Sequence, residues 1–246
     1  MAEPMTEPMT ESPLREMNTG EVIREAFRLY RQHFAALVLI ALVPHVALLA
    51  LDTALGGAEI DRGLGLGLLL AVTVVLNALV LAAMTHALGG AVVGRMPGLV
   101  EAYREGFGRR VLSIVAAYLV IWMLVTLGFL AFILPGLVIG GLFVPAIPII
   151  VLEKRNPLQA LGRSYRMMRP VLAKGTAVFV FVIVVSGLLP LLFHLIVGPG
   201  PYSPLLSAIA GAVTLPLAYT ASVVLYLSLR SLEGYTPEQL EAELTG

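Results

Sequence analysis

The chain has 246 residues, of which 58% are hydrophobic and 13% are charged, whereas soluble domains carry about 25% charged residues. Such an apolar excess excludes an ordinary soluble domain, and a formal net charge of zero lacks the basic excess typical of nucleic-acid binders. The sequence contains no cysteine, which excludes disulfides and thiolate metal sites. Its apolar segments are continuous rather than alternating, so they predict membrane-spanning helices and not barrel strands.

The N-terminal segment precedes the first apolar block. Residues 1–18 are rich in Glu, Pro, Met and Thr and are predicted to be disordered. A short amphipathic helix is expected next, with Asn18 or Thr19 as its N-cap. Its apolar residues recur every three or four positions, and another face carries Arg24, Arg28 and Arg31.

Four blocks without Asp, Glu, Lys or Arg are long enough to cross a hydrocarbon layer of about 30 Å, which takes about 20 residues. They cover residues 32–51, 64–94, 111–152 and 175–229. The turn signal Leu134-Pro135-Gly136 splits the third block, and a segment rich in Gly and Pro, residues 198–204, splits the fourth. The sequence therefore predicts an all-α integral membrane protein with six transmembrane helices within residues 19–232.

The basic residues predict the orientation of these spans, because Lys and Arg accumulate in short cytoplasmic loops. With the N-terminus inside, all but one of the 16 Lys and Arg residues fall on the inner side, and the exception is Arg62. This pattern predicts a multi-pass protein of the cell membrane, plasma or inner, with both termini in the cytoplasm. Residues 233–246 are expected to form a short, exposed, acidic helix that begins at Pro237 with Thr236 as its N-cap.

Three inner segments resemble one another, namely residues 23–28, 100–104 and 158–166. Each combines apolar and basic residues at helical spacing, which is typical of a helix lying in the membrane interface. The chain is therefore divided into three units of interfacial helix plus transmembrane hairpin, residues 19–94, 97–152 and 156–230. The alternative is that basic amphipathic helices before spans look alike through shared physics alone.

Three segments also carry a resemblance to a known family, and they read AFRLYRQHF (26–34), EKRNPLQALGRS (153–164) and YLSLR (226–230). Over residues 19–235 the chain resembles the membrane domain of some glycerophosphoryl diester phosphodiesterases and related stand-alone, uncharacterised prokaryotic six-span membrane proteins. The resemblance implies a six-span membrane fold. In the phosphodiesterases a soluble catalytic domain follows the membrane domain, and no residue of this chain matches that domain. No catalytic residue is carried over, and we expect no enzyme activity.

Polar residues within the predicted spans are candidates for a site, since an ionisable group in a span is a functional hypothesis by default. His45 and His194, with Asp52 at the outer end of the first span, would form a small proton or metal site if their spans were adjacent. The alternative is a neutral histidine bonded to a carbonyl that a nearby proline frees. No metal or other cofactor is predicted.

The second span adds Asn77 and His86 to His45 and His194 as a candidate intramembrane polar site. Thr73 and Thr85 lie on the same predicted helix. Such residues either hydrogen-bond to neighbouring helices or line the path of a solute.

The basic inner face is the strongest functional signal of the sequence. Candidate contacts to anionic lipids are Arg24, Arg28, Arg31, Arg104, Arg163, Arg166 and Arg169. The alternative is that these cations only set the topology. The leading hypothesis is a non-enzymatic membrane protein that acts through contact with the lipid bilayer, in particular anionic lipids, or as a partner of another membrane protein or a homo-oligomer. The second hypothesis is a small-solute transporter or channel.

Overall fold

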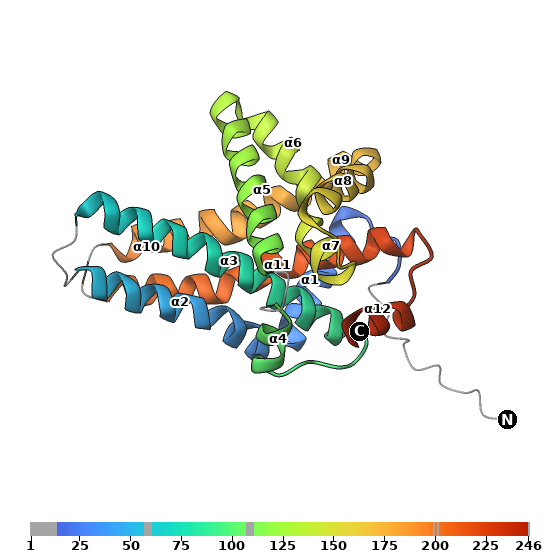
Figure 1. Cartoon of the computed structure of the whole chain (residues 1–246), viewed down its shortest axis with the longest axis horizontal. Helices are drawn as coiled ribbons and strands as arrows, with labels where there is room; N and C mark the ends of the chain where they lie inside the picture. The colour runs from blue at the N-terminus through green and yellow to red at the C-terminus, as the bar shows by residue number, and fades with distance from the viewer. Residues whose placement is uncertain (1–13, 57–60, 107–110, 199, 201, 246) are drawn as a thin grey trace.

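The computed structural model describes residues 14–56, 61–106, 111–198, 200 and 202–245, and these residues form helices and short connections without a strand (Figure 1). The first helices are α1 (Thr19–Gln32), α2 (Phe34–Gly56), α3 (Arg62–Val92), α4 (Leu99–Gly106), α5 (Val111–Ala131), α6 (Ile133–Phe143) and α7 (Ala146–Leu152). They are followed by α8 (Pro157–Met168), α9 (Leu172–Ile183), α10 (Leu189–Val197), α11 (Ser203–Ser231) and α12 (Pro237–Thr245). The all-α prediction is confirmed for the described residues.

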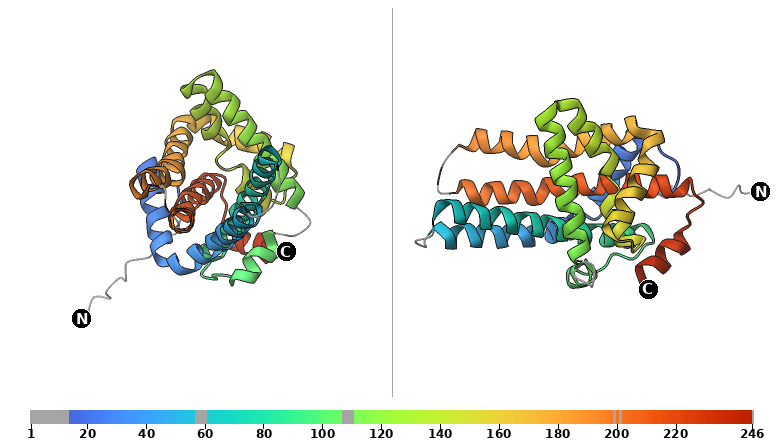
Figure 2. Two further views of the ribbon diagram at one scale, coloured as in Figure 1. Left: turned by 90° about the vertical axis from the view of Figure 1, so that its left-hand side faces the viewer. Right: turned by 45° about the horizontal axis from the view of Figure 1, so that its top comes forward.

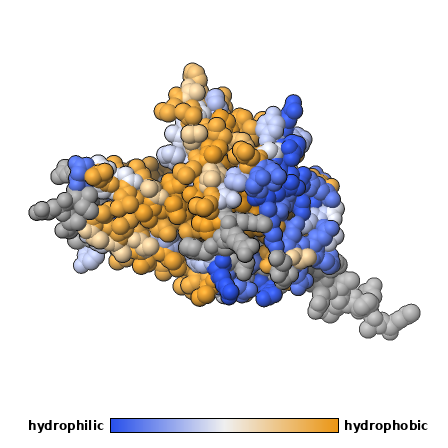
Figure 3. Space-filling view, in the orientation of Figure 1, coloured by the Kyte–Doolittle hydropathy of each residue, from blue (hydrophilic) through white to orange (hydrophobic). Residues whose placement is uncertain are grey.

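Within the described residues, six helical stretches are long and apolar enough to cross a membrane, as the sequence predicts. They cover Phe34–Leu55, Gly63–Val92, Val111–Ala131, Ile133–Leu152, Pro157–Val197 and Ser203–Ser231. Figure 3 shows apolar surface over the long helices and a hydrophilic band at the end of the molecule where α8 and α12 lie. This distribution indicates a multi-pass membrane protein.

Helix α11 is the centre of the bundle. It contacts α1, α2, α3, α9 and α10, and every residue from Pro216 to Leu229 is buried. The helices α2, α3 and α10 run along the long axis with it, whereas the hairpin of α5 and α6 projects away from them (Figures 1 and 2). The core therefore surrounds α11, and the outward faces of its neighbours carry the apolar surface.

The hairpin turn between α5 and α6 falls just before the predicted position at residues 134–136. Helix α5 ends at Ala131, Phe132 is extended with φ −166° and ψ 160°, and α6 begins at Ile133. Proline is compatible with the first turn of a helix, because the N–H that it lacks has no helical partner there. Pro135 therefore lies in the first turn of α6 instead of marking the break.

Glycines let α5, α6 and α9 approach one another closely. A Cβ added to Gly128 would lie 2.8 Å from the Cα of Gly136, and one added to Gly141 would lie 2.6 Å from the backbone nitrogen of Thr176. Small residues of this kind are a common basis of helix association in lipid. They hold the hairpin tightly closed and pack α6 against α9.

Both ends of the described chain pack on the bundle, which differs from the predicted tails. Within the predicted disordered segment 1–18, Met17 is buried, its N–H donates to Ser228 Oγ (2.9 Å), and Lys174 Nζ donates to its carbonyl oxygen (2.7 Å). Residues 1–13 lie outside the described residues. Helix α12, predicted as exposed, buries Leu240 against Gly89 of α3. These contacts join residues far apart in the sequence, so they are not evident from hydropathy.

Candidate functional site

Helix α1 is amphipathic and runs across the bundle, where it contacts α11, α9 and α2 (Figure 2). Asn18, one of the two predicted caps, forms a capping box with Glu21, and the hydrogen bond from the Asn18 N–H lowers the pKa of the Glu21 carboxyl. The Tyr30 hydroxyl donates to the carbonyl oxygen of Val213 in α11 (2.7 Å). The buried residues of α1 are Val22, Ala26, Leu29 and Tyr30. The other side of α1 carries Arg24, Arg28 and Arg31, and we call it the arginine face.

That arginine face forms a groove of about 450 Å³, which we call the α1 groove. Its lining residues are Arg24, Phe27, Arg28, Arg31 and Gln32. The Glu25 carboxylate accepts hydrogen bonds from Arg28 Nε (2.8 Å) and Nη2, and this pairing raises the pKa of Arg28. Arg24 and Arg31 are exposed and form no ion pair with any described residue. The groove therefore presents two unpaired guanidinium groups and one neutralised one.

The spacing of the two unpaired cations suits an anionic group of moderate size. Arg24 and Arg31 are two turns apart, or about 10 Å along the helix axis. Phe27 lies between them with 43% of its surface exposed, and its ring meets that of Phe181 edge-on at 6.0 Å between centroids. Guanidinium groups bind phosphate oxygens in a fork, and an exposed aromatic ring offers an apolar surface beside them. This combination matches a phosphate bearing an apolar tail.

The remaining candidate lipid contacts divide into two groups. Arg104 of α4, Arg166 of α8 and Arg169 just beyond α8 are exposed and form no ion pair with the described residues. Arg163, on the contrary, is 18% exposed and is paired with Glu153 and Glu233. Its placement differs from the predicted lipid contact, because its charge is already neutralised within the protein.

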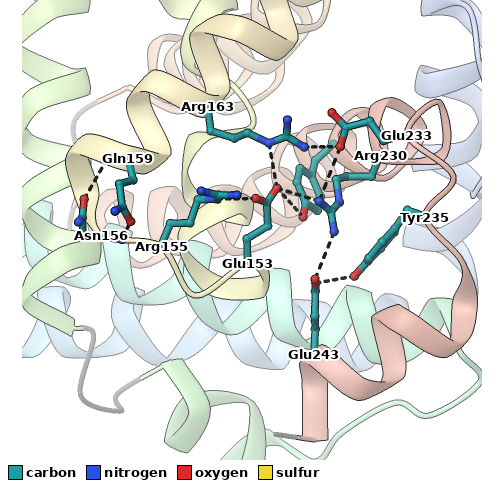
Figure 4. A network of polar contacts seen from close by, with 10 residues as sticks. Glu153, Arg155, Asn156, Gln159, Arg163, Arg230, Glu233, Tyr235 and Glu243 are labelled. Carbon is teal, nitrogen blue, oxygen red and sulfur yellow. Dashed lines mark hydrogen bonds and ion pairs between the residues drawn. The ribbon is translucent and has the colours of Figure 1, made fainter.

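Arg163 belongs to an ion-pair network centred on Glu153, whose side chain is 4% exposed (Figure 4). Glu153 Oε2 accepts a hydrogen bond from Arg155 Nε (2.7 Å). The other oxygen, Oε1, lies 3.5 Å from Arg163 Nε and 3.4 Å from Arg230 Nη1, and the Tyr226 hydroxyl donates to it (3.4 Å). One carboxylate thus joins the end of α7 to α8 and α11.

Two further acids extend the network, which we call the Glu153 network, to α12. Glu233 pairs with Arg163 and Arg230, while Glu243 accepts from Arg230 Nη2 (3.2 Å) and from the Tyr235 hydroxyl. The Arg230 guanidinium stacks over the Tyr235 ring at 4.1 Å from its centroid. Burial, together with the hydrogen bond to Glu243, raises the pKa of Tyr235. The network fastens the last helix to the spans.

The sequence interpretation did not identify the Glu153 network. The sequence feature that could have indicated it is the position of Glu153 and Glu233, which each lie near the end of an apolar span and close to arginines. Two segments that carry the family resemblance, residues 153–164 and 226–230, supply five of its members, namely Glu153, Arg155, Arg163, Tyr226 and Arg230. In this structure those motifs therefore form a cross-link between helices.

The structure places His45 and His194 against α11. His45 Nδ1 lies 2.7 Å from the carbonyl oxygen of Ala41, and His194 Nδ1 lies 3.2 Å from Ser207 Oγ. The His45 ring also packs on Gly211, where an added Cβ would approach Nε2 to 2.4 Å. His45 is thus bonded to a carbonyl of its own helix, one turn earlier.

A pocket of about 310 Å³ lies beside these residues, and its lining includes His45, Asp52 and Thr73. The carbonyl that Pro44 frees is that of Ile40, because a proline cannot donate to the residue four positions earlier. That carbonyl accepts a hydrogen bond from the Tyr103 hydroxyl (2.6 Å) rather than from a histidine.

Asn77 and His86 lie in other parts of the molecule. Asn77 Nδ2 donates to the carbonyl oxygen of Thr73 (2.9 Å), and its Oδ1 accepts from the Tyr219 hydroxyl of α11 (3.3 Å). The second bond joins two helices, which is one of the two roles that the sequence suggests for Asn77. His86 is about 13 Å further along α3 and lines a separate pocket of about 210 Å³ with Arg95 and Glu101. His45, Asn77 and His86 therefore line three different pockets, and His194 lines none of these three.

No group of three or more His, Asp or Glu residues within the described ranges is arranged to hold a metal ion. Comparison with protein-family models, curated proteins and solved structures finds no match for this chain. The resemblance to the membrane domain of the phosphodiesterases therefore stays a prediction from short motifs, and function has to be argued from the geometry.

Proposed function

We propose that this membrane protein binds the headgroups of anionic phospholipids through the α1 groove and acts through that lipid contact, without catalysing a reaction. The supporting observation is that Arg24 and Arg31 line one groove with the exposed ring of Phe27, and that neither arginine lies within ion-pair distance of an acid among the described residues. A partner role for another membrane protein would build on the same contact.

The energetics favour a headgroup over a free anion at this groove. A well-placed cation near a charged membrane surface contributes about 1 kcal/mol, so two of them give a preference for anionic over zwitterionic lipid of about 2 kcal/mol. The apolar side chain of Phe27 adds to the attraction for a lipid, since burying it against acyl chains removes apolar surface from water. A free phosphate would gain nothing from this ring.

We also propose that α4 and α8 act as interfacial helices of the same kind, which gives three units of interfacial helix plus hairpin with both termini in the cytoplasm. Support comes from the exposed cations Arg104, Arg166 and Arg169, and from the position of α1, α4 and α8 directly before α2, α5 and α9. In this arrangement the α1 groove faces the inner leaflet of the cell membrane.

The test of the groove is a lipid titration of the purified protein by native mass spectrometry, with phosphatidylglycerol against phosphatidylcholine. We expect preferential retention of phosphatidylglycerol, and the double variant Arg24→Gln, Arg31→Gln to weaken that retention by about 20- to 30-fold, or about 1 kcal/mol per cation. Arg95→Gln is the matched control, because Arg95 is 65% exposed but lies outside the groove. Equal retention of the two lipids, or an unchanged double variant, would overturn the proposal.

The topology is tested by single cysteines, which the chain allows because it has none of its own. We expect a membrane-impermeant maleimide to label Tyr202→Cys in intact cells and Glu16→Cys only after permeabilisation. Both positions are exposed in the structure. Labelling with the opposite sidedness would contradict the proposed orientation.

A further inference from the structure

Another cavity, of about 360 Å³, lies among the apolar helices and away from the α1 groove. Its walls come from α3, α5, α6, α7, α9 and α11, and Trp122 and Val125 of α5 lie on one side while Phe179 and Val182 of α9 lie on another. The volume falls within the range of about 300–1,000 Å³ that is usual for small-molecule sites. The bundle therefore holds a ligand-sized space at the level of its spans.

The chemistry of the walls excludes a charged occupant. Among the described residues that line the cavity, none is Asp, Glu, Lys, Arg or His, and most are aliphatic or aromatic. A charge without a partner in so apolar a space would cost several kcal/mol. The occupant is therefore uncharged and largely hydrocarbon.

Apart from the indole of Trp122, five polar side chains line the cavity, and four of them have partners within the protein. Ser186 and Ser222 donate to carbonyl oxygens of their own helices, and Tyr219 donates to Asn77. The hydroxyl of Tyr118 has no hydrogen-bond partner among the described residues, although its ring packs against the core. In an apolar space such a donor needs an acceptor, because an unmade hydrogen bond is costly there.

One lining residue of the cavity is exposed on the outside of the bundle, and another lies in a π-helical turn. Trp122 lines the cavity and is 56% exposed on the outside of α5, within a stretch apolar enough to span a membrane. Ser186 lies in the π-helical turn Val184–Leu188 between α9 and α10. Isolated π-helical turns interrupt α-helices frequently at functional sites. The cavity can thus be reached from the bilayer beside Trp122.

We infer that this cavity binds one uncharged lipid from the bilayer, with a hydrocarbon chain along the apolar walls and a carbonyl or ether oxygen that accepts a hydrogen bond from Tyr118. The site is independent of the α1 groove, because it selects a neutral molecule and uses no arginine.

The test uses Trp122, the single tryptophan of the chain. The protein in maltoside micelles is titrated with a monoacylglycerol that carries a dibromostearoyl chain, and quenching of Trp122 fluorescence is recorded. We expect saturable quenching, weakened about five- to tenfold in apparent affinity by Tyr118→Phe, which removes one neutral hydrogen bond. Tyr103→Phe is the matched control, because that hydroxyl donates to Ile40 outside the cavity lining.

A second variant, Ser186→Leu, fills the cavity with apolar volume, and we expect it to abolish the saturable component. Quenching that rises linearly with the mole fraction of brominated lipid, and that is equal in all these proteins, would show contact with bulk lipid alone and would overturn the inference. So would a saturable signal that Tyr118→Phe leaves unchanged. Because the probe is neutral, loss of phosphatidylglycerol binding at the α1 groove would not affect any of these outcomes.

Discussion

Helices α1 and α8 have similar sequence patterns, with apolar residues on one side and arginines three or four positions apart on another, yet their arginines have different roles. In α1, Arg24 and Arg31 are exposed and unpaired, whereas in α8 Arg163 is held between Glu153 and Glu233. The neighbours make the difference. Helix α1 packs on apolar parts of α11 and α9, while α8 begins just after Glu153 at the end of α7.

The largest expected effect comes from breaking the network that α8 joins. Glu153→Gln removes the charge that Arg155, Arg163 and Arg230 share, and loss of one partner of a buried ion pair costs about 3–5 kcal/mol. The free energy of unfolding in mixed micelles measures it. Glu101→Gln is the control, because the exposed pair of Glu101 with Arg95 contributes about 0.2–1 kcal/mol at most. Equal stability of the two variants would show that the Glu153 network does not stabilise the fold.

The caps of the two helices offer the next comparison. Asn18 and Asn156 each accept a hydrogen bond from the third helical N–H, in a capping box with Glu21 and Gln159 respectively. Asn18→Ala and Asn156→Ala should each cost about 1 kcal/mol of unfolding free energy. Asn156→Ala should in addition increase hydrogen exchange in α12, which the network connects to α8. If exchange in α12 rises equally in both variants, that connection is absent.

A smaller effect is expected at the buried side of α1. Tyr30→Phe removes the hydrogen bond to Val213 and should lower the free energy of unfolding by about 0.5–1 kcal/mol. Retention of phosphatidylglycerol should stay unchanged, because Tyr30 is not part of the α1 groove. A variant that lost lipid retention without losing stability would contradict this separation of the two faces.

The smallest effect is a difference in pH dependence between the two caps. The pKa of Glu21 is lowered in the folded protein, so its contribution is present above the unfolded value of 4.5 and is lost as the pH falls through the folded pKa. The equivalent residue of α8 is Gln159, which does not titrate. Hydrogen-exchange protection, corrected for intrinsic rates, should therefore fall more in α1 than at the start of α8 on acidification. Glu21→Gln should abolish the difference.

Features that depend on residues close to one another in the sequence were predictable. The continuous apolar blocks and the turn signals within them predict six apolar stretches. The N-caps at Asn18 and Thr236 are predicted by the acidic or amide residue three positions later. The α1 groove was predictable for the same reason, since all its arginines lie on one helix. The turn signal at residues 134–136 predicts the break slightly late, because Pro135 belongs to the first turn of α6 and the chain is extended at Phe132.

Features that depend on distant residues were not predictable in this way. Glu153 meets Arg230 only because the end of α7 and the end of α11 are adjacent in the fold. Similarly, residues of six helices line the neutral cavity, and Tyr118 is an ordinary residue of an apolar block until its missing partner is seen. Local periodicity holds no information on which side chains of different helices face one another.

The turn of the α5–α6 hairpin has a consequence for the membrane itself. Leu130, Phe132, Ile133 and Leu134 are each exposed by 70% or more, and no residue from 111 to 152 carries a charge. With no group anchoring the tip in water, the thickness of the hydrocarbon layer sets how deep the hairpin inserts. A thinner or thicker bilayer would therefore change the depth of this tip.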